Sequence, residues 1–552
     1  MCNEMSAPPV TAELPRRRIA IIFGAISLAV LPAVLDGTIV ATALPSIVGD
    51  LGGVDQISWV VTAYLLTQTI ATPLFGKFGD LYGRRRLFEI AILVFTVASL
   101  LAGFSQNMLQ LIGARALQGF AAGGLIVLCQ AMIADVVSPR ERGRWQGFFG
   151  VVFGVASVAG PLVGGFLTDQ LSWPWIFFIN LPLGVLAWVV SRAVLPESPR
   201  RPQVRIDWIG TAVLSAAIAC LVLFTTWGGL EYEWTSPVII GLAIATVVLT
   251  AVFIRVERRA VEPAMPLGLF RSRTLVLSAA ILFVMGAVMF GTVTYLPTFL
   301  QIANGASASN AGLLLIPQLL GTMGASVIAG QIVSRTGRYR IFPIVGSAIA
   351  TVGMYLLSQL GPDSSRLQSG VAMFVLGFGI GTVLQTLVVA VQNEAPARHL
   401  GVATSTISFF RAIGGSIGVA VFGSLFTSRI TDLLGDAALD VTPDSLQKMS
   451  PAQAADTASA FADAVTNVFS FAVPFLVIAF VLAWFVRETP LRTASGGVAR
   501  SLATELEFGE DALMAYSDPS FVPEEVELEE PRQPAVAPPG PPADERGRAN
   551  GR

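Results

Sequence analysis

The sequence predicts an all-α integral membrane protein with fourteen transmembrane helices, arranged as two six-helix bundles and two inserted helices. Of its 552 residues, 53% are hydrophobic and only 13% are charged, whereas soluble domains carry about 25% charged residues. Apolar runs of about 18 residues or more, long enough to cross a bilayer as helices, recur along the chain. This composition excludes a water-soluble enzyme, and the net charge of −2 gives no reason to expect a nucleic-acid partner.

Each predicted span is an apolar run that begins and ends at charged or turn-forming residues. The first span follows the arginines at 16–18, the second and third are joined by the basic segment 76–86, and the fifth follows the arginines at 140–144. The fourteen ranges are 19–44, 57–78, 87–105, 108–134, 145–168, 175–195, 208–227, 236–255, 274–299, 310–333, 341–360, 368–391, 401–427 and 463–486.

The distribution of basic residues supports this count and indicates an orientation. With the N-terminus in the cytoplasm, three of the 35 Lys and Arg residues fall outside (Arg366, Arg429, Lys448) and two fall within spans (Arg115, Arg411). The other 30 lie on the cytoplasmic side, as the positive-inside rule requires. One missed span would invert every later loop, so we expect both termini in the cytoplasm. Arginine outnumbers lysine 33 to 2, which suggests a GC-rich bacterial genome and therefore a bacterial plasma membrane.

A repeat with an offset of 254 residues divides the chain. The offset relates Gly76 to Gly330, Gly83 to Gly337, Gly160 to Gly414, and Gly164 to Gly418. The ninth span then corresponds to the first, and the seventh and eighth spans are an insertion into a parallel repeat. The predicted parts are a leader (1–18), a bundle (19–200), two inserted helices (201–257), a linker (258–273), a second bundle (274–490) and a disordered cytoplasmic tail (491–552).

No pattern in the sequence indicates catalysis, a metal site or nucleotide binding. The three cysteines form no CxxC pair, and the single histidine, His399, lies in a polar connection beside Arg398. No phosphate-binding loop of the GxxxxGK[ST] kind is present. The sequence therefore predicts no catalytic residue, no metal and no cofactor, and it points to the proton motive force instead of ATP as the energy source.

Five segments resemble motifs of one transporter family. They are 35–45 (LDGTIVATALP), 76–86 (GKFGDLYGRRR), 113–119 (GARALQG), 154–165 with its glycines, and 175–182 (WIFFINLP). In this order, and on these spans, the chain resembles the major facilitator superfamily in its fourteen-helix drug:proton antiporter branch, the multidrug efflux transporter type. The resemblance covers about residues 19–490 and implies that family's fold and proton-driven transport.

Asp36, Arg115 and Gln118 are the candidate proton-coupling residues. Asp36 lies about 18 residues beyond Arg18, in the outer part of the first span, and Arg115 lies at a similar depth in the fourth. A carboxylate inside a membrane is costly unless it is paired or faces a cavity. We interpret Asp36 as a proton site, Arg115 as its partner and Gln118 as an extension of the polar path. The alternative is a structural ion pair.

The segment around Asp80 is the candidate cytoplasmic gate. Gly76 and Gly83 allow a tight turn and close helix approach. Asp80 can accept charge-assisted hydrogen bonds from Arg84, from Arg85 or from a helix N-terminus. The resemblance implies that this loop latches the two halves in the outward-open state. The alternative is a basic loop that only sets the topology.

The fifth span carries small residues and a proline that permit close packing and a bend. They are Gly154, Gly160, Pro161, Gly164 and Gly165. The resemblance implies a seal between the halves that is typical of exporters, and the alternative is ordinary small-residue packing. Arg411, about ten residues into the thirteenth span, is expected to snorkel toward the cytoplasm instead of lining the path.

The substrate cavity is expected between the halves, near the membrane midplane. Polar or aromatic candidates in the middle of spans are Tyr64, Gln68, Gln130, Phe290, Gln318 and Gln385. A cavity with aromatic residues and few charges suits amphipathic cations or neutral hydrophobic compounds.

The sequence therefore predicts a proton-coupled exporter of drug-like, hydrophobic or cationic small molecules across the plasma membrane. Its partners would be a small-molecule substrate, protons and the lipid bilayer, without nucleic acid or ATP. The alternatives are an exporter of a dedicated metabolite, lipid or siderophore on the same fold, a solute importer, and a membrane enzyme or sensor.

Overall fold

The structure, a computed structural model, is helical throughout the part of the chain that it describes, apart from turns, loops and one isolated β-bridge between Gly228 and Tyr232. The described residues are 15–52, 56–196, 207–229, 231–260, 263–303, 313–362, 364–396, 399–435 and 449–491. Residues 1–14 of the predicted leader and 492–552 of the predicted tail lie outside these ranges.

Each of the fourteen predicted ranges overlaps a helix. The first half of the chain holds α1 (Arg16–Leu51), α2 (Ile57–Tyr82), α3 (Arg84–Gly103), α4 (Met108–Val136), α5 (Pro139–Gln170), α6 (Trp175–Phe178) and α7 (Asn180–Val194). Next come α8 (Trp208–Trp227), α9 (Pro237–Glu257) and η2 (Leu267–Arg271). The rest are α10 (Arg273–Thr298), η3 (Phe299–Ala303), α12 (Ile316–Thr336), α13 (Ile341–Ser358), α14 (Arg366–Glu394), α15 (Leu400–Leu434) and α17 (Pro451–Ala483).

Twelve helical stretches in the described residues are long and apolar enough to cross a membrane, so the predicted count of fourteen is not confirmed. The two long helices that are not among them are α2 and α5. Threonines and Gln68 lower the hydropathy of α2, although the Thr69 and Thr72 hydroxyls donate to carbonyls of the same helix at 2.7 and 2.9 Å. In α5 the first turns are charged, with Arg140, Glu141, Arg142 and Arg144, and glycine is frequent after them.

Local sequence signals set several helix ends. Ser365 forms a capping box with Gln368 at the start of α14, and Ser450 forms one with Gln453 at the start of α17. As a result α17 begins twelve residues before the predicted span. Gly83 (φ 90°) ends α2 and Gly337 (φ 73°) ends α12, a conformation that favours glycine. These two turns are related by the 254-residue offset.

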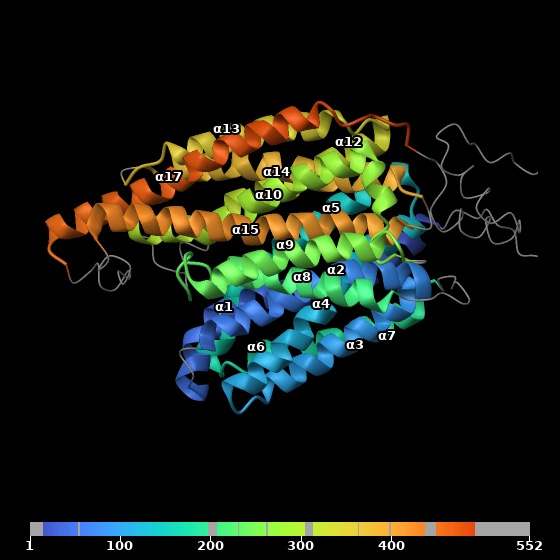
Figure 1. Ribbon diagram of the computed structural model, residues 1–552, viewed down its shortest axis with the longest axis horizontal. Coiled ribbons are helices and arrows are strands. Elements are labelled where there is room, and N and C mark those ends of the chain that lie inside the picture. The colour runs from blue at the N-terminus through green and yellow to red at the C-terminus, as the bar shows by residue number, and fades with distance from the viewer. Residues whose placement is uncertain are drawn as a thin grey trace, which may run out of the picture.

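Glycines related by the 254-residue offset contact the first helix of their own half. Helices α1–α7 form one half, which we call the N-half, and α10–α17 form the C-half (Figure 1). In the N-half, Gly160 of α5 packs directly against Thr38 of α1. In the C-half, Gly414 of α15 packs directly against Phe283 of α10. Between the halves, α2 lies on α15 and α5 lies on α12, so the two halves meet through equivalent pairs of helices.

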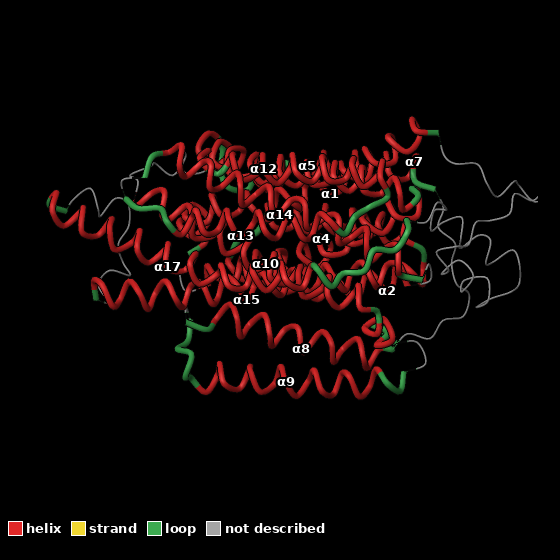
Figure 2. The backbone as a smooth tube through the Cα atoms, turned by 90° about the horizontal axis from the view of Figure 1, so that it is seen from above, coloured by secondary structure: helices red, strands yellow, loops and turns green. Residues whose placement is uncertain are grey.

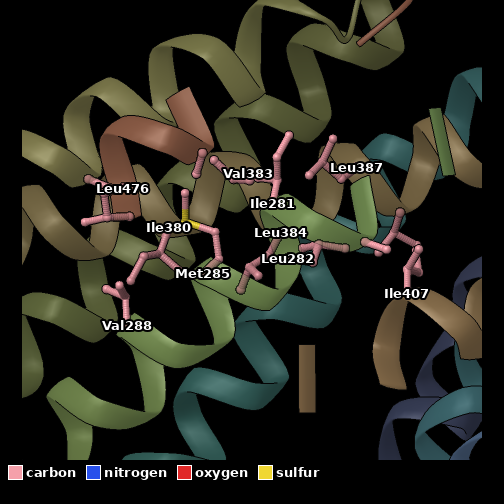
Figure 3. Close-up of a cluster of buried hydrophobic side chains, with 14 of the residues drawn as sticks. Ile281, Leu282, Met285, Val288, Ile380, Val383, Leu384, Leu387, Ile407 and Leu476 are labelled. Carbon is pink, nitrogen blue, oxygen red and sulfur yellow. The ribbon is translucent and has the colours of Figure 1, made fainter. Parts of the chain in front are cut away.

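The apolar core of the C-half surrounds α14. Ile380 and Leu384 of α14 pack with Ile281 and Met285 of α10 and with Leu476 of α17, and their exposed fractions lie between 0% and 6% (Figure 3). In the N-half, α4 has the corresponding place and is buried along nearly its whole length. The two core helices are therefore surrounded by protein along most of their length, and their exposed large side chains include Leu109 of α4 and Leu367 of α14.

The helices α8 and α9 lie side by side along one edge of the molecule, with α9 outermost (Figure 2). Trp227 of α8 stacks on Trp59 of α2 with 5.2 Å between ring centroids. The Thr225 and Ser416 hydroxyls, from α8 and α15, lie 2.6 Å apart. The pair therefore bridges one helix of each half from the outside.

Candidate functional site

A buried ion pair joins α1 to α4. Asp36 has no exposed surface, and Arg115 is 2% exposed. The Arg115 guanidinium donates to an Asp36 carboxylate oxygen, and its Nε donates to the Val60 carbonyl of α2 at 3.3 Å. Gln118 Nε2 lies 3.4 Å from the other Asp36 oxygen, and Gln118 Oε1 accepts from Arg115 at 3.0 Å. The structure thus brings together the three residues that the sequence pointed to.

Three further side chains complete this cluster. Asn180, at the start of α7, places Nδ2 3.5 Å from Asp36 Oδ1. Ser99 of α3 accepts from Gln118 at 2.8 Å and from Asn180 at 3.4 Å. The Arg115 guanidinium lies 4.2 Å from the centroid of the Tyr64 ring. Sequence reasoning missed the roles of Ser99 and Asn180, although Asn180 lies in the motif 175–182.

The contacts of this cluster fit a charged Asp36 carboxylate better than a neutral one. A charged carboxylate is balanced by Arg115 and by amide donors, whereas a neutral one would leave the guanidinium without its counterion. In an apolar interior the loss of one partner of a buried pair costs about 3–5 kcal/mol. Protonation of Asp36 would therefore favour a rearrangement of α1 and α4 that gives Arg115 other acceptors.

A second polar cluster connects the halves at the end of the bundle that carries the α2–α3 turn, which we call the α2–α3 end. Asp80 accepts from the backbone N–H groups of Gly401 (3.2 Å) and Val402 (3.1 Å), in the first turn of α15. It also accepts from Arg84 at 2.6 Å. A carboxylate at a helix N-terminus is stabilised by the unpaired N–H groups and the helix dipole.

Arg84 ties the helices of the N-half beneath this contact. It is fully buried and donates to Asp135 at 2.6 Å and to the Ala131 carbonyl of α4 at 2.7 Å. Arg85 pairs with Glu89 at 2.8 Å and donates to the Arg192 carbonyl at 2.7 Å. Within the predicted gate motif, Asp80 therefore reaches the C-half, whereas these bonds of Arg84 and Arg85 organise the N-half.

Two arginines that the sequence reasoning did not single out make further contacts between the halves. Arg142, 1% exposed, donates to the Gln392 carbonyl near the end of α14 at 3.2 Å. Arg140 donates to the Ser334 and Arg335 carbonyls near the end of α12, both at 3.2 Å. Cations at helix C-termini are favoured for the same reason that Asp80 is favoured at an N-terminus. Charged residues of the N-half thus cap three helices of the C-half.

Glycines allow the two halves to approach closely here. A Cβ on Gly76 would overlap the Ser405 side chain, and a Cβ on Gly143 would lie 2.8 Å from the Gly330 carbonyl. In the predicted α5 set, Gly154 contacts Met323 of the C-half, but Gly160 and Gly164 contact α1. Gly165 has no neighbour within 4 Å. Most of this set therefore joins α5 to the helix that carries Asp36. Pro161 lies within α5, but its side chain is outside the described part of the structure.

The predicted cavity residues fall in different places. Gln130 of α4 accepts from Ser408 of α15 at 3.3 Å, and Gln385 Nε2 lies 4.0 Å from the Cβ position of Gly150, so both lie where the halves meet. The buried Oε1 atoms of Gln318 and Gln385 have no hydrogen-bond partner among the described residues. Gln68 is half-buried on α2, Phe290 (41% exposed) lies against Gly415, and Tyr64 belongs to the Asp36 cluster.

Among the described residues, no group of three or more His, Cys, Asp or Glu side chains is arranged to hold a metal ion. Two equivalent helical halves that meet at a charged, glycine-lined end, with a buried ion pair inside one of them, define a membrane transporter. The chain belongs to the Major Facilitator Superfamily, whose sequence profile matches residues 26–419. It is a transporter and not an enzyme.

The relatives with curated descriptions are transporters, and the chain matches most of the length of each. The chain is 42% identical over 479 residues to an uncharacterised MFS-type transporter of Mycobacterium tuberculosis strain H37Rv, covering 85% of this chain and 70% of the relative. It is 38% identical over 427 residues to the multidrug transporter protein MdtP of Bacillus subtilis, covering 77% of each chain. Multidrug resistance protein 3 of Bacillus subtilis is 37% identical, covering 74% of this chain and 80% of the relative.

Solved structures share the fold at low sequence identity. A proton:xylose symporter superposes with a TM-score of 0.59 at 16% identity, covering 89% of this chain and all of that one. A human organic anion transporter superposes with a TM-score of 0.59 at 17% identity, covering 86% of this chain and all of that one. These similarities establish an all-helical MFS fold, and the curated relatives place the chain in the branch that contains multidrug efflux proteins.

Proposed function

We propose that this protein is a proton-coupled antiporter that exports drug-like small molecules across the bacterial plasma membrane. The observation that carries the proposal is the buried Asp36–Arg115 pair, because proton coupling needs a titratable group inside the barrier. The relatives named as multidrug transporters support export of drug-like compounds. No ATP and no cofactor are involved in this mechanism.

Protonation of Asp36 is coupled to movement of the halves through the contact between α1 and α5. Asp36 lies on α1 two residues before Thr38, which packs on Gly160 of α5. Helix α5 in turn contacts α12 of the C-half through Gly143 and Gly154. A change in the Asp36–Arg115 pair on protonation therefore reaches the contact between the halves through α5. Proton uptake from outside would drive the switch that opens the α2–α3 end toward the substrate.

The available energy is sufficient for useful export. One proton that moves through about 150 mV supplies about 3.5 kcal/mol, which supports a substrate gradient of roughly 300-fold.

We propose that all fourteen long helices cross the membrane, with the α2–α3 end and both termini in the cytoplasm. Packing of α2 and α5 between the halves supports this, because helices that face protein need less hydrophobic side chains than helices that face lipid. The basic residues Arg84, Arg140 and Arg142 at the α2–α3 end agree with the positive-inside rule. The contacts of Asp80, Arg140 and Arg142 join the halves at this end, which is the cytoplasmic end in the proposed orientation.

Purified protein in proteoliposomes tests the proposed function. Fluorescent cationic, neutral and anionic compounds are loaded in turn on the cytoplasmic side, and a pH gradient is imposed with the opposite side acidic. We expect export that follows the gradient and stops when a protonophore collapses it, together with proton movement in the opposite direction. Export that ignores the gradient, across a panel of cationic, neutral and anionic compounds, would refute antiport.

Substitutions on α9 are expected to have little effect on transport. The Thr246 and Thr250 hydroxyls donate to carbonyls of α9 itself at 2.8 and 2.7 Å, and neighbouring Val247 is 70% exposed. Thr246→Val and Thr250→Val should therefore leave the export rate within about twofold of wild type. A large loss at equal expression would show that the outer inserted helix takes part in transport.

A further inference from the structure

Arg411 of α15 is an intramembrane cation without a hydrogen-bond or ion-pair partner among the described residues. It lies eleven residues after Leu400, about 17 Å along the helix and near the middle of a membrane core about 30 Å thick. It is half-buried, and no carboxylate, hydroxyl or carbonyl of the described residues bonds to its guanidinium. The other arginine within a span, Arg115, is paired. A charge in this position without a counterion is costly, so residues of this kind usually have a function.

The packing of α15 shows which way this position faces. Gly414 and Gly418, on one side of Arg411, lie against α10, and the Arg411 backbone itself lies against Gly286 of α10. Ser408, three residues earlier and on the same helical face, donates to Gln130 of the N-half at 3.3 Å. Arg411 therefore lies on the side of α15 that packs on α10, one helical turn after the contact of Ser408 with the N-half. The expected snorkelling of its guanidinium toward the cytoplasm stays a prediction.

A hydrogen-bond donor of the other half is nearby. Gln130 Oε1 accepts from Ser408, and the Gln130 backbone carbonyl lies 3.4 Å from Gln392 Nε2. The hydrogen bonds of Gln130 to described residues use its Oε1 and its backbone carbonyl, which leaves Nε2 as a donor. Its partner Ser408 lies one helical turn before Arg411 on α15. The guanidinium and this amide are both donors, and an acceptor with negative charge suits the two best because it also balances the charge of the guanidinium.

We propose that Arg411 and Gln130 form a binding site for an anionic group of the substrate, such as a carboxylate or a sulfonate on an apolar skeleton. The proposal rests on the proposed transport function and narrows its substrates to amphipathic organic anions and zwitterions. One donor comes from each half, so the bound anion bridges the two halves at the midplane. Substrate specificity then differs from the preference for cations that the sequence suggested.

Binding to three pyrene compounds tests the site, because they share one skeleton and differ in the terminal group. Protein in lipid nanodiscs is titrated at pH 7.5 with 1-pyrenebutyrate, 1-pyrenebutanol and 1-pyrenebutylamine. Energy transfer from tryptophan to pyrene is recorded, and the signal from empty nanodiscs is subtracted. We expect the carboxylate to bind at least about tenfold more tightly than the alcohol, with the amine weakest. Equal binding of the three compounds would overturn the proposal.

Variants separate this site from a general charge effect. Arg411→Gln should bring the affinity for the carboxylate down to that for the alcohol. Arg411→Lys should keep part of the preference for the carboxylate, and its binding would show that a protein changed at this position still folds. Gln130→Leu should weaken carboxylate binding by a smaller factor. The control is Arg366→Gln, which removes an exposed arginine at the start of α14 and should leave all three affinities unchanged. A preference that survives Arg411→Gln would overturn the proposal.

The outcome is independent of proton coupling, because the measurement is of equilibrium binding without a gradient. Anion-selective binding in a protein that shows no proton-driven export would leave this site in place and refute antiport. Proton-driven export with no selectivity for the anion would do the reverse.

Discussion

Asp36→Asn is expected to abolish proton-coupled export while substrate still binds. Asparagine keeps the size of the side chain and one carbonyl acceptor for Arg115, but it has no proton to gain or lose. Asp36 is fully buried among Arg115, Gln118 and Asn180. Bulk water therefore does not reach this site to carry the proton in place of the lost carboxylate. The measurement is proton release on substrate addition, paired with export driven by an imposed pH gradient.

Conservative changes at the pair sharpen this test. Asp36→Glu keeps the titration but moves the carboxyl group by about one methylene, so partial coupling is expected. Arg115→Lys should be intermediate, because lysine keeps the charge but lacks the planar fork that contacts both a carboxylate and Gln118. All variants are compared at equal expression, since an orphaned buried charge destabilises the fold by about 3–5 kcal/mol.

A matched control is available on the same helix. Asp50, near the C-terminal end of α1, accepts from Trp173 Nε1 at 2.9 Å and is not part of the Asp36 cluster. Asp50→Asn should retain proton-driven export. If Asp36→Asn still couples protons to export, the proton site lies elsewhere and the proposed role of the pair fails.

The second large effect is expected from Asp80→Asn, which should open the α2–α3 end. The neutral amide loses the charge-assisted bonds to Arg84 and weakens those to the N-terminus of α15. Such bonds contribute about 1.5–3 kcal/mol each. The equilibrium between the two states should therefore shift by about tenfold or more, and turnover should fall while substrate affinity changes little.

Spin labels placed across this end would measure the shift. Arg86→Cys on α3 and Arg338→Cys after α12 put labels on exposed positions of the two halves, in a background without the native cysteines. Pulsed electron–electron double resonance should show a larger population of long label-to-label distances in Asp80→Asn than in the parent. Glu89→Gln, which removes a carboxylate that pairs within the N-half, is the control and should keep the parent distribution. An unchanged distribution in Asp80→Asn would contradict the latch.

Much of the fold could be predicted from the sequence because membrane spans are set by length and hydropathy. Each predicted range overlaps a helix, and Gly160 and Gly414, which the 254-residue offset relates, each pack on the first helix of their own half. The pairing of Asp36 with Arg115 could also be predicted, because opposite charges at similar depth in an apolar bundle lower their desolvation cost by pairing. Helix ends were less predictable: α17 begins at a capping box outside the apolar run.

The directions in which the helices face were decided only by the tertiary structure. Sequence alone could place Asp80 in a loop but could not show that it meets the first turn of α15, more than 300 residues later in the chain. It could not show that Gly160 faces α1 while Gly154 faces α12, or that Arg411 packs on α10 without a counterion among the described residues. The physical reason is that a span with apolar residues on all sides has no marked amphipathic period, because lipid and protein are both apolar neighbours. The depth of a residue in the membrane can therefore be predicted from the sequence, whereas the rotation of each helix about its axis is set by packing against the other helices.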